Sequence, residues 1–151
     1  EVVYITPTCM DAELVANAGA DIIAIDGTSR LRPKENLAGQ IEYIKHNLNK
    51  LVMVDIATVE DGLMCALLGV DIISTTLSGY TAETLEKNPD EPDFELLARL
   101  VKAVNKPIIL EGRIWEPAHV KKAFELGAFA VVIGSAITRP HLITRRFVDS
   151  Y

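Results

Sequence analysis

Cysteine and histidine are scarce in this sequence. Its 151 residues include two cysteines and three histidines. Cys9 and Cys65 lie far apart without the spacing of a metal-ligand pair, and the histidines form no ligand motif. This scarcity argues against a disulfide-stapled fold and against a metal site. We therefore expect reduced thiols, a cytoplasmic protein and no bound metal.

Long apolar runs and clusters of positive charge are also missing. No apolar stretch approaches the roughly 18 residues that span a bilayer. Residues 1–7 do not combine a basic stretch with an apolar core, as a signal peptide does. The 15 lysines and arginines are scattered, and the formal net charge is −6. These absences predict that the chain neither crosses a membrane nor binds nucleic acid.

The sequence does contain an internal repeat. Segments 16–26, 66–76 and 124–134 each consist of the end of a helix, a glycine and a short apolar strand. Gly19, Gly69 and Gly127 stand where the end of a helix needs a left-handed residue, so we expect a positive φ at each.

Two further runs, 51–55 and 107–111, are continuously apolar and end in a carboxylate. Continuous apolarity is typical of strands that are covered on both faces of a parallel sheet. The predicted strands are 22–26, 51–55, 71–76, 107–111 and 130–134, with a weaker sixth candidate at 2–6. The predicted helices are 11–18, 36–48, 60–68, 94–104, 117–126 and 139–148. Residues suited to helix starts are Thr58 with Asp61, Asp93, Pro117 and Pro140.

Alternating strands and helices predict an α/β fold with a parallel sheet, in a single domain over residues 1–151. A closed (β/α)8 TIM barrel and an open doubly wound sheet both fit this alternation. No G-x-G-x-x-G motif follows a strand, and the recurring two-strand unit favours the barrel. Because a barrel needs eight strands, we expect either a barrel that lacks about its first three strands or an open sheet.

Polar residues gather at the ends of the predicted strands, where barrel enzymes have their active sites. Together with two glycines, the residues at these ends are Asp26, Asp55, Thr75, Thr76, Glu111, Gly112, Arg113, Gly134 and Ser135. Any one of the carboxylates could be a solvated or ion-paired group. Three carboxylates at one rim favour a functional site.

The turn Gly134-Ser135 ends the last predicted strand and precedes a helix. Glycine lets a phosphate approach the backbone, and helix N-terminal amides hold anions. Arg139 follows within a few residues and could grip a phosphate with its guanidinium group. A tight turn that needs small residues and a solvated arginine are the alternatives. The long connection 78–92 is a candidate lid, or an excursion without function.

Five segments together resemble one known enzyme family. They are ADIIAID at 20–26, MVDIAT at 53–58, TTLSGYT at 75–81, EGR at 111–113 and GSAITRP at 134–140. In this order, over essentially the whole chain, they resemble the N-acetylmannosamine-6-phosphate 2-epimerases. The resemblance implies a cytoplasmic TIM-barrel isomerase of amino-sugar and sialic acid catabolism. Such an enzyme interconverts N-acetylmannosamine 6-phosphate and N-acetylglucosamine 6-phosphate.

The implied reaction removes the proton at C2, next to the aldehyde of the open-chain sugar, and returns one to the opposite face. It needs an acid/base pair and stabilisation of an enolate-like oxygen, but no redox cofactor. The resemblance implies that Glu111 is an acid/base group and that Asp55 orients the sugar or a lysine. It also implies that Gly134, Ser135 and Arg139 bind the phosphate. Further substrate-binding candidates are Asp26, Thr76, Gly79, Gly112 and Arg113.

One departure from the family pattern concerns the second acid/base group, which in the family is a lysine at the end of an earlier strand. No segment here matches it, and Lys34, Lys45 and Lys50 fall in predicted helices or loops. By resemblance we expect the chain to lack the first three barrel strands, with that lysine and an arginine that helps to bind the sugar. The 151 residues by themselves should then be inactive.

Two other hypotheses stay open. The chain could belong to another phosphate-binding barrel enzyme, such as a lyase or synthase, which shares the phosphate turn. It could also be a truncated product that persists as a binding module. A partial barrel exposes apolar strand edges and helix faces, so we expect a homo-oligomer.

Overall fold

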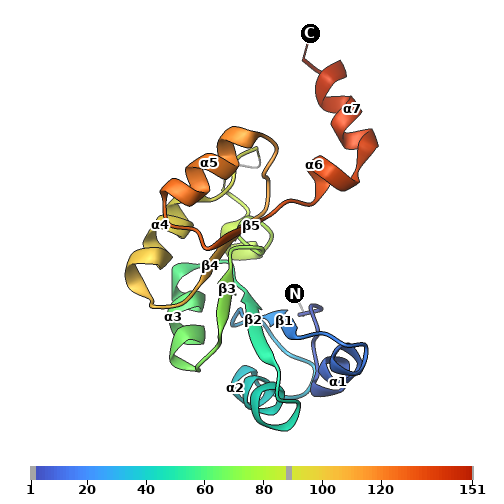
Figure 1. Cartoon of the computed structure of the whole chain (residues 1–151), viewed down its shortest axis with the longest axis vertical. Coiled ribbons are helices and arrows are strands. Elements are labelled where there is room, and N and C mark those ends of the chain that lie inside the picture. Colours follow the sequence, from blue (N-terminus) through green and yellow to red (C-terminus); the bar gives the residue numbers. More distant parts are fainter. Residues whose placement is uncertain (1–2, 88–89, 151) are drawn as a thin grey trace.

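Strands and helices alternate along the chain (Figure 1), as the sequence predicts. The computed structural model describes residues 3–87 and 90–150. Its strands are β1 (Ile22–Asp26), β2 (Leu51–Asp55), β3 (Ile72–Ser74), β4 (Ile108–Glu111) and β5 (Ala130–Val132). Its α-helices are α1 (Cys9–Asn17), α2 (Leu37–Glu42), α3 (Val59–Leu67), α4 (Phe94–Ala103), α5 (Pro117–Glu125), α6 (Ser135–Thr138) and α7 (Pro140–Val148). A π-helix, η1 (Tyr43–Asn47), follows α2, and a 3₁₀-helix, η2 (Ala82–Thr84), follows β3.

The sheet is wound in one direction. Its strand order is β1-β2-β3-β4-β5, and each strand is parallel to the next. A doubly wound sheet instead reverses its strand order at a switch point and carries helices on both faces. Consecutive parallel neighbours are the winding of a (β/α)8 barrel wall. The predicted α/β fold of the barrel type is therefore confirmed.

The two faces of the sheet differ in burial. Alternate residues of the strands, such as Ile23, Val54 and Ile73, are fully buried in a cluster with residues of the helices. The other face carries Ile22 and Leu51, which are 43% and 49% exposed. Because the side chains of a strand alternate, the register places Asp26, Asp55 and Glu111 on this second face, at the carboxyl ends of their strands. Asp26, Asp55 and Glu111 are the last residues of β1, β2 and β4.

Local sequence signals account for the starts and ends of the helices. Thr58 accepts a hydrogen bond from the Asp61 amide, and the Asp61 side chain bonds back to the Thr58 amide, which completes the expected capping box. Asp93 caps α4 as expected. The three repeat glycines have φ angles of +98°, +82° and +96°, which confirms their left-handed conformation. Among the described residues, no helix has both the length and the apolar character that crossing a membrane requires.

Some predicted boundaries are wrong. The helix expected at 36–48 changes to a π-helix, where the Leu48 amide donates to the carbonyl of Tyr43, five residues earlier. β3 and β5 are shorter than predicted, because their ladders with neighbouring strands end at Ser74 and Val132. The short helix α6 was not expected. Of the weak candidate strand 2–6, residue 2 lies outside the described residues, and residues 3–6 form no strand.

Candidate active site

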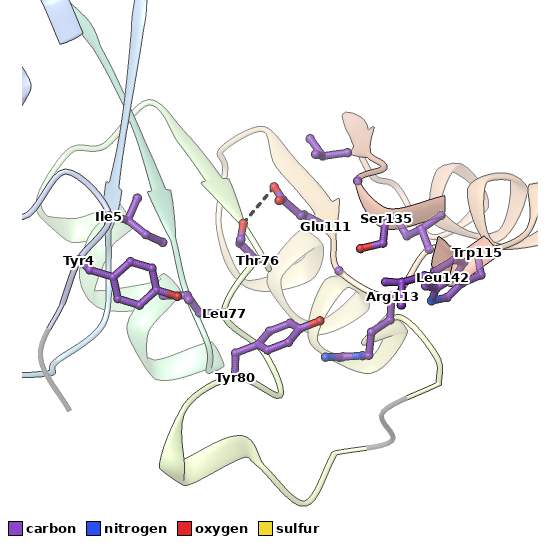
Figure 2. A pocket seen from close by; sticks show the side chains of 14 residues that line it. Tyr4, Ile5, Thr76, Leu77, Tyr80, Glu111, Arg113, Trp115, Ser135 and Leu142 are labelled. Carbon is purple, nitrogen blue, oxygen red and sulfur yellow. Dashed lines mark hydrogen bonds between the residues drawn. The ribbon is translucent and has the colours of Figure 1, made fainter. Parts of the chain in front are cut away.

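A cavity of about 510 Å³ opens at the carboxyl end of the sheet (Figure 2). The sequence-predicted residues that line it are Thr76, Glu111, Gly112, Arg113, Gly134 and Ser135. Chain segments far apart in the sequence meet here, since the Tyr4 and Ile5 side chains also line the cavity. The fold thus brings together six of the ten site residues that the sequence predicts, drawn from the ends of β3, β4 and β5.

The Thr76 hydroxyl lies between two carboxyl groups. Its oxygen is 2.5 Å from Oδ1 of Asp55 and 3.1 Å from Oε2 of Glu111 (Figure 2 shows the contact with Glu111). The Ser74 hydroxyl lies 2.8 Å from the same oxygen. Asp55 is 4% exposed and is not one of the cavity-lining residues, whereas Glu111 is partly exposed and lines the cavity. Asp55 is therefore connected to the cavity through Thr76.

Both carboxyl groups hold protons more tightly than ordinary carboxylates. Burial raises the pKa of Asp55 to about 6, against the opposing hydrogen bond from Thr76, and the negative charges of Glu111 and Asp26 add to the rise. Burial also raises the pKa of Glu111, against the hydrogen bonds from Thr76 and Ser74. A carboxyl group that titrates closer to neutral pH can both accept and donate a proton in one reaction cycle.

Asp26 has a different environment from Asp55, although the two residues are register partners. Its carboxylate is fully buried and accepts hydrogen bonds from the amide and hydroxyl of Thr28, at 2.9 and 2.6 Å. It also forms an ion pair with Arg30, and Arg32 lies 3.9 Å away. Asp26 does not line the cavity, and these partners give it a structural explanation. Its predicted contact with substrate stays a prediction.

Arg113 binds the connection between β3 and α4. Its Nη1 donates to the Ser78 carbonyl at 2.6 Å and its Nε to the Glu91 carbonyl at 2.7 Å. The guanidinium group also lies 5.6 Å from the centre of the Tyr80 ring, beside it in Figure 2. A Cβ atom at Gly79, whose φ is +84°, would lie 2.4 Å from Nη1. Arg113 and Gly79 therefore shape the cavity edge by fastening a loop, a role that their spacing in the sequence did not indicate.

The turn at Gly134 is open on its outer side. A Cβ atom there would meet nothing within 4 Å. Packing therefore does not explain the glycine, while an open backbone leaves room for a ligand. Arg139 is exposed at the junction of α6 and α7, which extend away from the sheet in Figure 1, and it does not line the cavity. The Arg139 amide donates to the Ser135 carbonyl at 3.2 Å, so its backbone lies at the turn, whereas its exposed side chain is outside the cavity lining. The predicted contact of that side chain with a phosphate stays a prediction.

No lysine is among the residues that line this cavity in the described part of the chain. Lys45 Nζ donates to the Gly69 carbonyl at 2.6 Å and to Asp71 at 2.8 Å. Gly69 and Asp71 precede β3, so Lys45 lies at the amino end of the strands, opposite to the cavity. Within residues 3–87 and 90–150, no three His, Cys, Asp or Glu side chains are grouped so that they could hold a metal ion. Ser74 is a site residue that the sequence reasoning missed, although its two-residue spacing from Thr76 could have indicated it.

The chain is similar to known proteins in both sequence and structure. A family model described as "Putative N-acetylmannosamine-6-phosphate epimerase" matches residues 1–151. A "Putative N-acetylmannosamine-6-phosphate 2-epimerase" of Caldanaerobacter subterraneus subsp. tengcongensis is 54% identical over 147 residues, which cover 96% of this chain and 61% of that protein. A protein of the same name from Clostridium perfringens is 47% identical, over 97% of this chain and 66% of its own length.

The solved structure of the N-acetylmannosamine-6-phosphate 2-epimerase from Clostridium perfringens matches with a TM-score of 0.93 and 46% identity. The match covers 99% of this chain and 64% of that one. The chain therefore spans slightly less than two thirds of the length of these relatives. A thiamine phosphate pyrophosphorylase from Pyrococcus furiosus matches with a TM-score of 0.63 at 15% identity, a likeness of fold alone.

Proposed function

Because the chain belongs to the N-acetylmannosamine-6-phosphate epimerase family, we propose that the protein interconverts N-acetylmannosamine 6-phosphate and N-acetylglucosamine 6-phosphate. The observation that carries the proposal is the position of Glu111. Its carboxyl group lies on the cavity wall, has a raised pKa and is hydrogen-bonded to Thr76. This is the environment that an acid/base group needs for proton transfer at a carbon atom.

In the proposed reaction Glu111 exchanges a proton with C2 of the open-chain sugar. The C2–H bond breaks, its electron pair forms an enolate with the neighbouring aldehyde, and a proton returns to the opposite face. A second acid/base group must serve that face, and the resemblance assigns it to a lysine. No redox cofactor takes part, because no electrons leave the sugar.

The sugar phosphate would lie with its phosphate at Gly134 and Ser135, where the backbone is open to the cavity. Backbone amides at a turn of this kind can donate to phosphate oxygens. A contribution from Arg139 stays a prediction, since its side chain is exposed and lies outside the cavity lining. The cytoplasmic location, the place in sialic acid catabolism and the self-association also stay predictions.

Deuterium exchange tests the proposal. The complete gene product that carries this chain is incubated with N-acetylmannosamine 6-phosphate in D₂O, and NMR follows deuterium at C2 and the formation of the second epimer. We expect wild-type protein to exchange the C2 proton and Glu111→Gln to lose the exchange by at least about 100-fold, the usual contribution of a general acid/base. The matched control is Glu125→Gln, since Glu125 lies on α5 with a side chain that is 62% exposed.

The outcomes separate the role of Glu111 from the identity of the substrate. Exchange that survives in Glu111→Gln would remove Glu111 from its proposed role. Wild-type protein that leaves the hexosamine phosphate unchanged, but turns over an unrelated sugar phosphate, would favour another barrel enzyme. Equal loss of exchange in Glu111→Gln and Glu125→Gln would indicate damage to the fold, and would also argue against a specific role for Glu111.

A further inference from the structure

We propose that Thr76 is a positioning residue that passes a proton between Glu111 on the cavity wall and Asp55 behind it. The inference extends the proposed function, because the proton would be the one that Glu111 exchanges with the sugar. The bridge itself exists without substrate. It can therefore be tested on the substrate-free protein, and its failure is distinguishable from failure of the proposed reaction.

The bridge has more hydrogen bonds than the two hydroxyl groups can supply with hydrogen. The Thr76 oxygen makes three contacts, with Asp55 Oδ1 at 2.5 Å, Glu111 Oε2 at 3.1 Å and Ser74 Oγ at 2.8 Å. Each hydrogen bond needs one hydrogen between its two oxygens, and the two hydroxyl groups supply one each. The third hydrogen must come from a carboxyl group. The Ser74 hydroxyl also lies 3.5 Å from Oε2 of Glu111, where its one hydrogen can be used instead. When all the bonds to Thr76 are formed, Asp55 and Glu111 therefore hold at least one proton between them.

Asp55 lies behind Thr76, away from the cavity. Its side chain is 4% exposed, and within the described part of the chain its carboxyl group is hydrogen-bonded to the Thr76 hydroxyl. Thr76 and Glu111 both line the cavity, whereas Asp55 does not. A proton that moves from a ligand in the cavity to Asp55 along these hydrogen bonds must therefore cross Thr76.

The transfer needs no other reactant. Protonated Glu111 donates its Oε2 proton to the Thr76 oxygen, while the Thr76 hydroxyl proton moves to Oδ1 of Asp55. One O–H bond breaks and one forms at Thr76, so the hydroxyl is restored, and Glu111 becomes a carboxylate. The net change is one proton moved from Glu111 to Asp55, and the reverse steps return it.

The charges around the bridge favour exchange in either direction. Burial raises the pKa of both carboxyl groups, so each can hold a proton at a pH at which an ordinary carboxyl group has lost it. The neighbouring charged group on β1 is Asp26, which adds to the rise at Asp55 and is itself paired with Arg30 and near Arg32. Glu111 is the charged group that faces Asp55 from β4. The carboxyl pair should therefore titrate as a coupled unit.

Carbon-detected NMR titration of the Asp55 and Glu111 carboxyl groups tests the bridge in the complete, substrate-free protein. Thr76→Val keeps the shape of the side chain and removes the hydroxyl. We expect it to raise both pKa values, that of Asp55 by roughly one unit, because the one Thr76 hydrogen that either carboxylate can accept is lost. Thr76→Ser keeps the hydroxyl and should restore nearly wild-type values. The matched control is Thr75→Val, since the Thr75 hydroxyl donates to the Glu111 backbone carbonyl and not to a carboxylate.

Every outcome of the titration decides the proposal. A rise of both pKa values in Thr76→Val, with neither raised in Thr75→Val, supports the bridge. An unchanged pKa at either carboxyl group in Thr76→Val overturns it, and so does an equal rise in both valine variants. If Thr76→Val does not fold, Thr76→Ala, which also removes the hydroxyl, serves instead, and it should raise the pKa of Asp55 above about 6. No change at Asp55 in that variant would overturn the bridge as well.

A rate measurement links the bridge to the reaction. With the sugar phosphate in D₂O, Thr76→Val should lower kcat about 10-fold or more and leave KM nearly unchanged, while Thr76→Ser restores kcat. Normal kcat in Thr76→Val would overturn the proton-carrying role. If the hexosamine phosphate is not a substrate at all, the titration alone still decides whether Thr76 couples the two carboxyl groups.

Discussion

Replacing Asp55 with asparagine should make the protein more stable at pH 8 and leave its stability nearly unchanged at pH 4. The Asp55 side chain is 4% exposed, and burial raises its pKa from 3.8 to about 6. The folded protein therefore binds this proton more tightly than the unfolded chain. Protonated Asp55 contributes its full share of the unfolding free energy below about pH 4, and this contribution is lost as the pH rises through 6. Asparagine cannot ionise, so the variant avoids this loss.

The size of the effect follows from the shift in the pKa. A rise of one pKa unit corresponds to about 1.36 kcal/mol, so the change from 3.8 to about 6 corresponds to about 3 kcal/mol. This is a large part of the roughly 5–15 kcal/mol by which domains are stable. Asparagine can still accept the hydrogen bond from Thr76 through its Oδ1 atom. The polar contact is therefore conserved while the buried charge is removed.

Urea unfolding at a series of pH values from 4 to 8 measures the effect. The difference in unfolding free energy between Asp55→Asn and wild type should grow from near zero at pH 4 to about 3 kcal/mol at pH 8. Taking the difference removes groups that do not interact with Asp55, such as Asp71 and Asp93, whose pKa values are lowered, against the opposing effect of burial, by hydrogen bonds with Lys45 and Lys87. A difference that does not depend on pH would refute the reasoning, because Asp55 would then be as well solvated in the folded state as in the unfolded chain.

Two further predictions concern reactivity and the loop. Burial raises the pKa of the Cys65 thiol to about 12, whereas Cys9 is partly exposed. Iodoacetamide at pH 8 should therefore alkylate Cys9 well before Cys65 in the native protein, as measured by mass spectrometry of the peptides. Labelling of Cys65 before Cys9 would contradict this prediction. Arg113→Ala removes the hydrogen bonds that fasten the loop between β3 and α4, so trypsin should cut after Lys87 several times faster than in wild type. Arg145→Ala, which changes an exposed residue of α7, is the control, and equal cleavage in the two variants would argue against the fastening role.

Much of the barrel wall could be predicted from short-range patterns. The apolar runs at 22–26 and 51–55 are strands with those bounds. The Thr58–Asp61 pair caps α3 because its hydrogen bonds join residues three positions apart, so the local sequence contains both partners. Boundaries were less accurate where distant partners decide them. β3 ends at Ser74 because its ladder with β2 ends there, and no signal within residues 71–76 marks that point.

The candidate site was predictable as a set of positions and less so as a set of roles. Strand ends at one edge of a parallel sheet must lie together, so the sequence could place Glu111 at the cavity. The roles depend on partners from other segments. Arg30 and Arg32 pair with Asp26, and carbonyl groups of the long loop bind Arg113, so these two candidates have partners within the protein.

The sequence by itself determined the alternation of strands and helices, the family resemblance and the carboxylates at the strand ends. These features follow from side-chain periodicity and from residue order, which are properties of a linear chain. The tertiary structure decided which carboxylate lines the cavity, which one is buried behind Thr76, and which one is neutralised by arginines. Burial and hydrogen bonding set the pKa of a carboxyl group, and both depend on neighbours that only the folded sheet brings together.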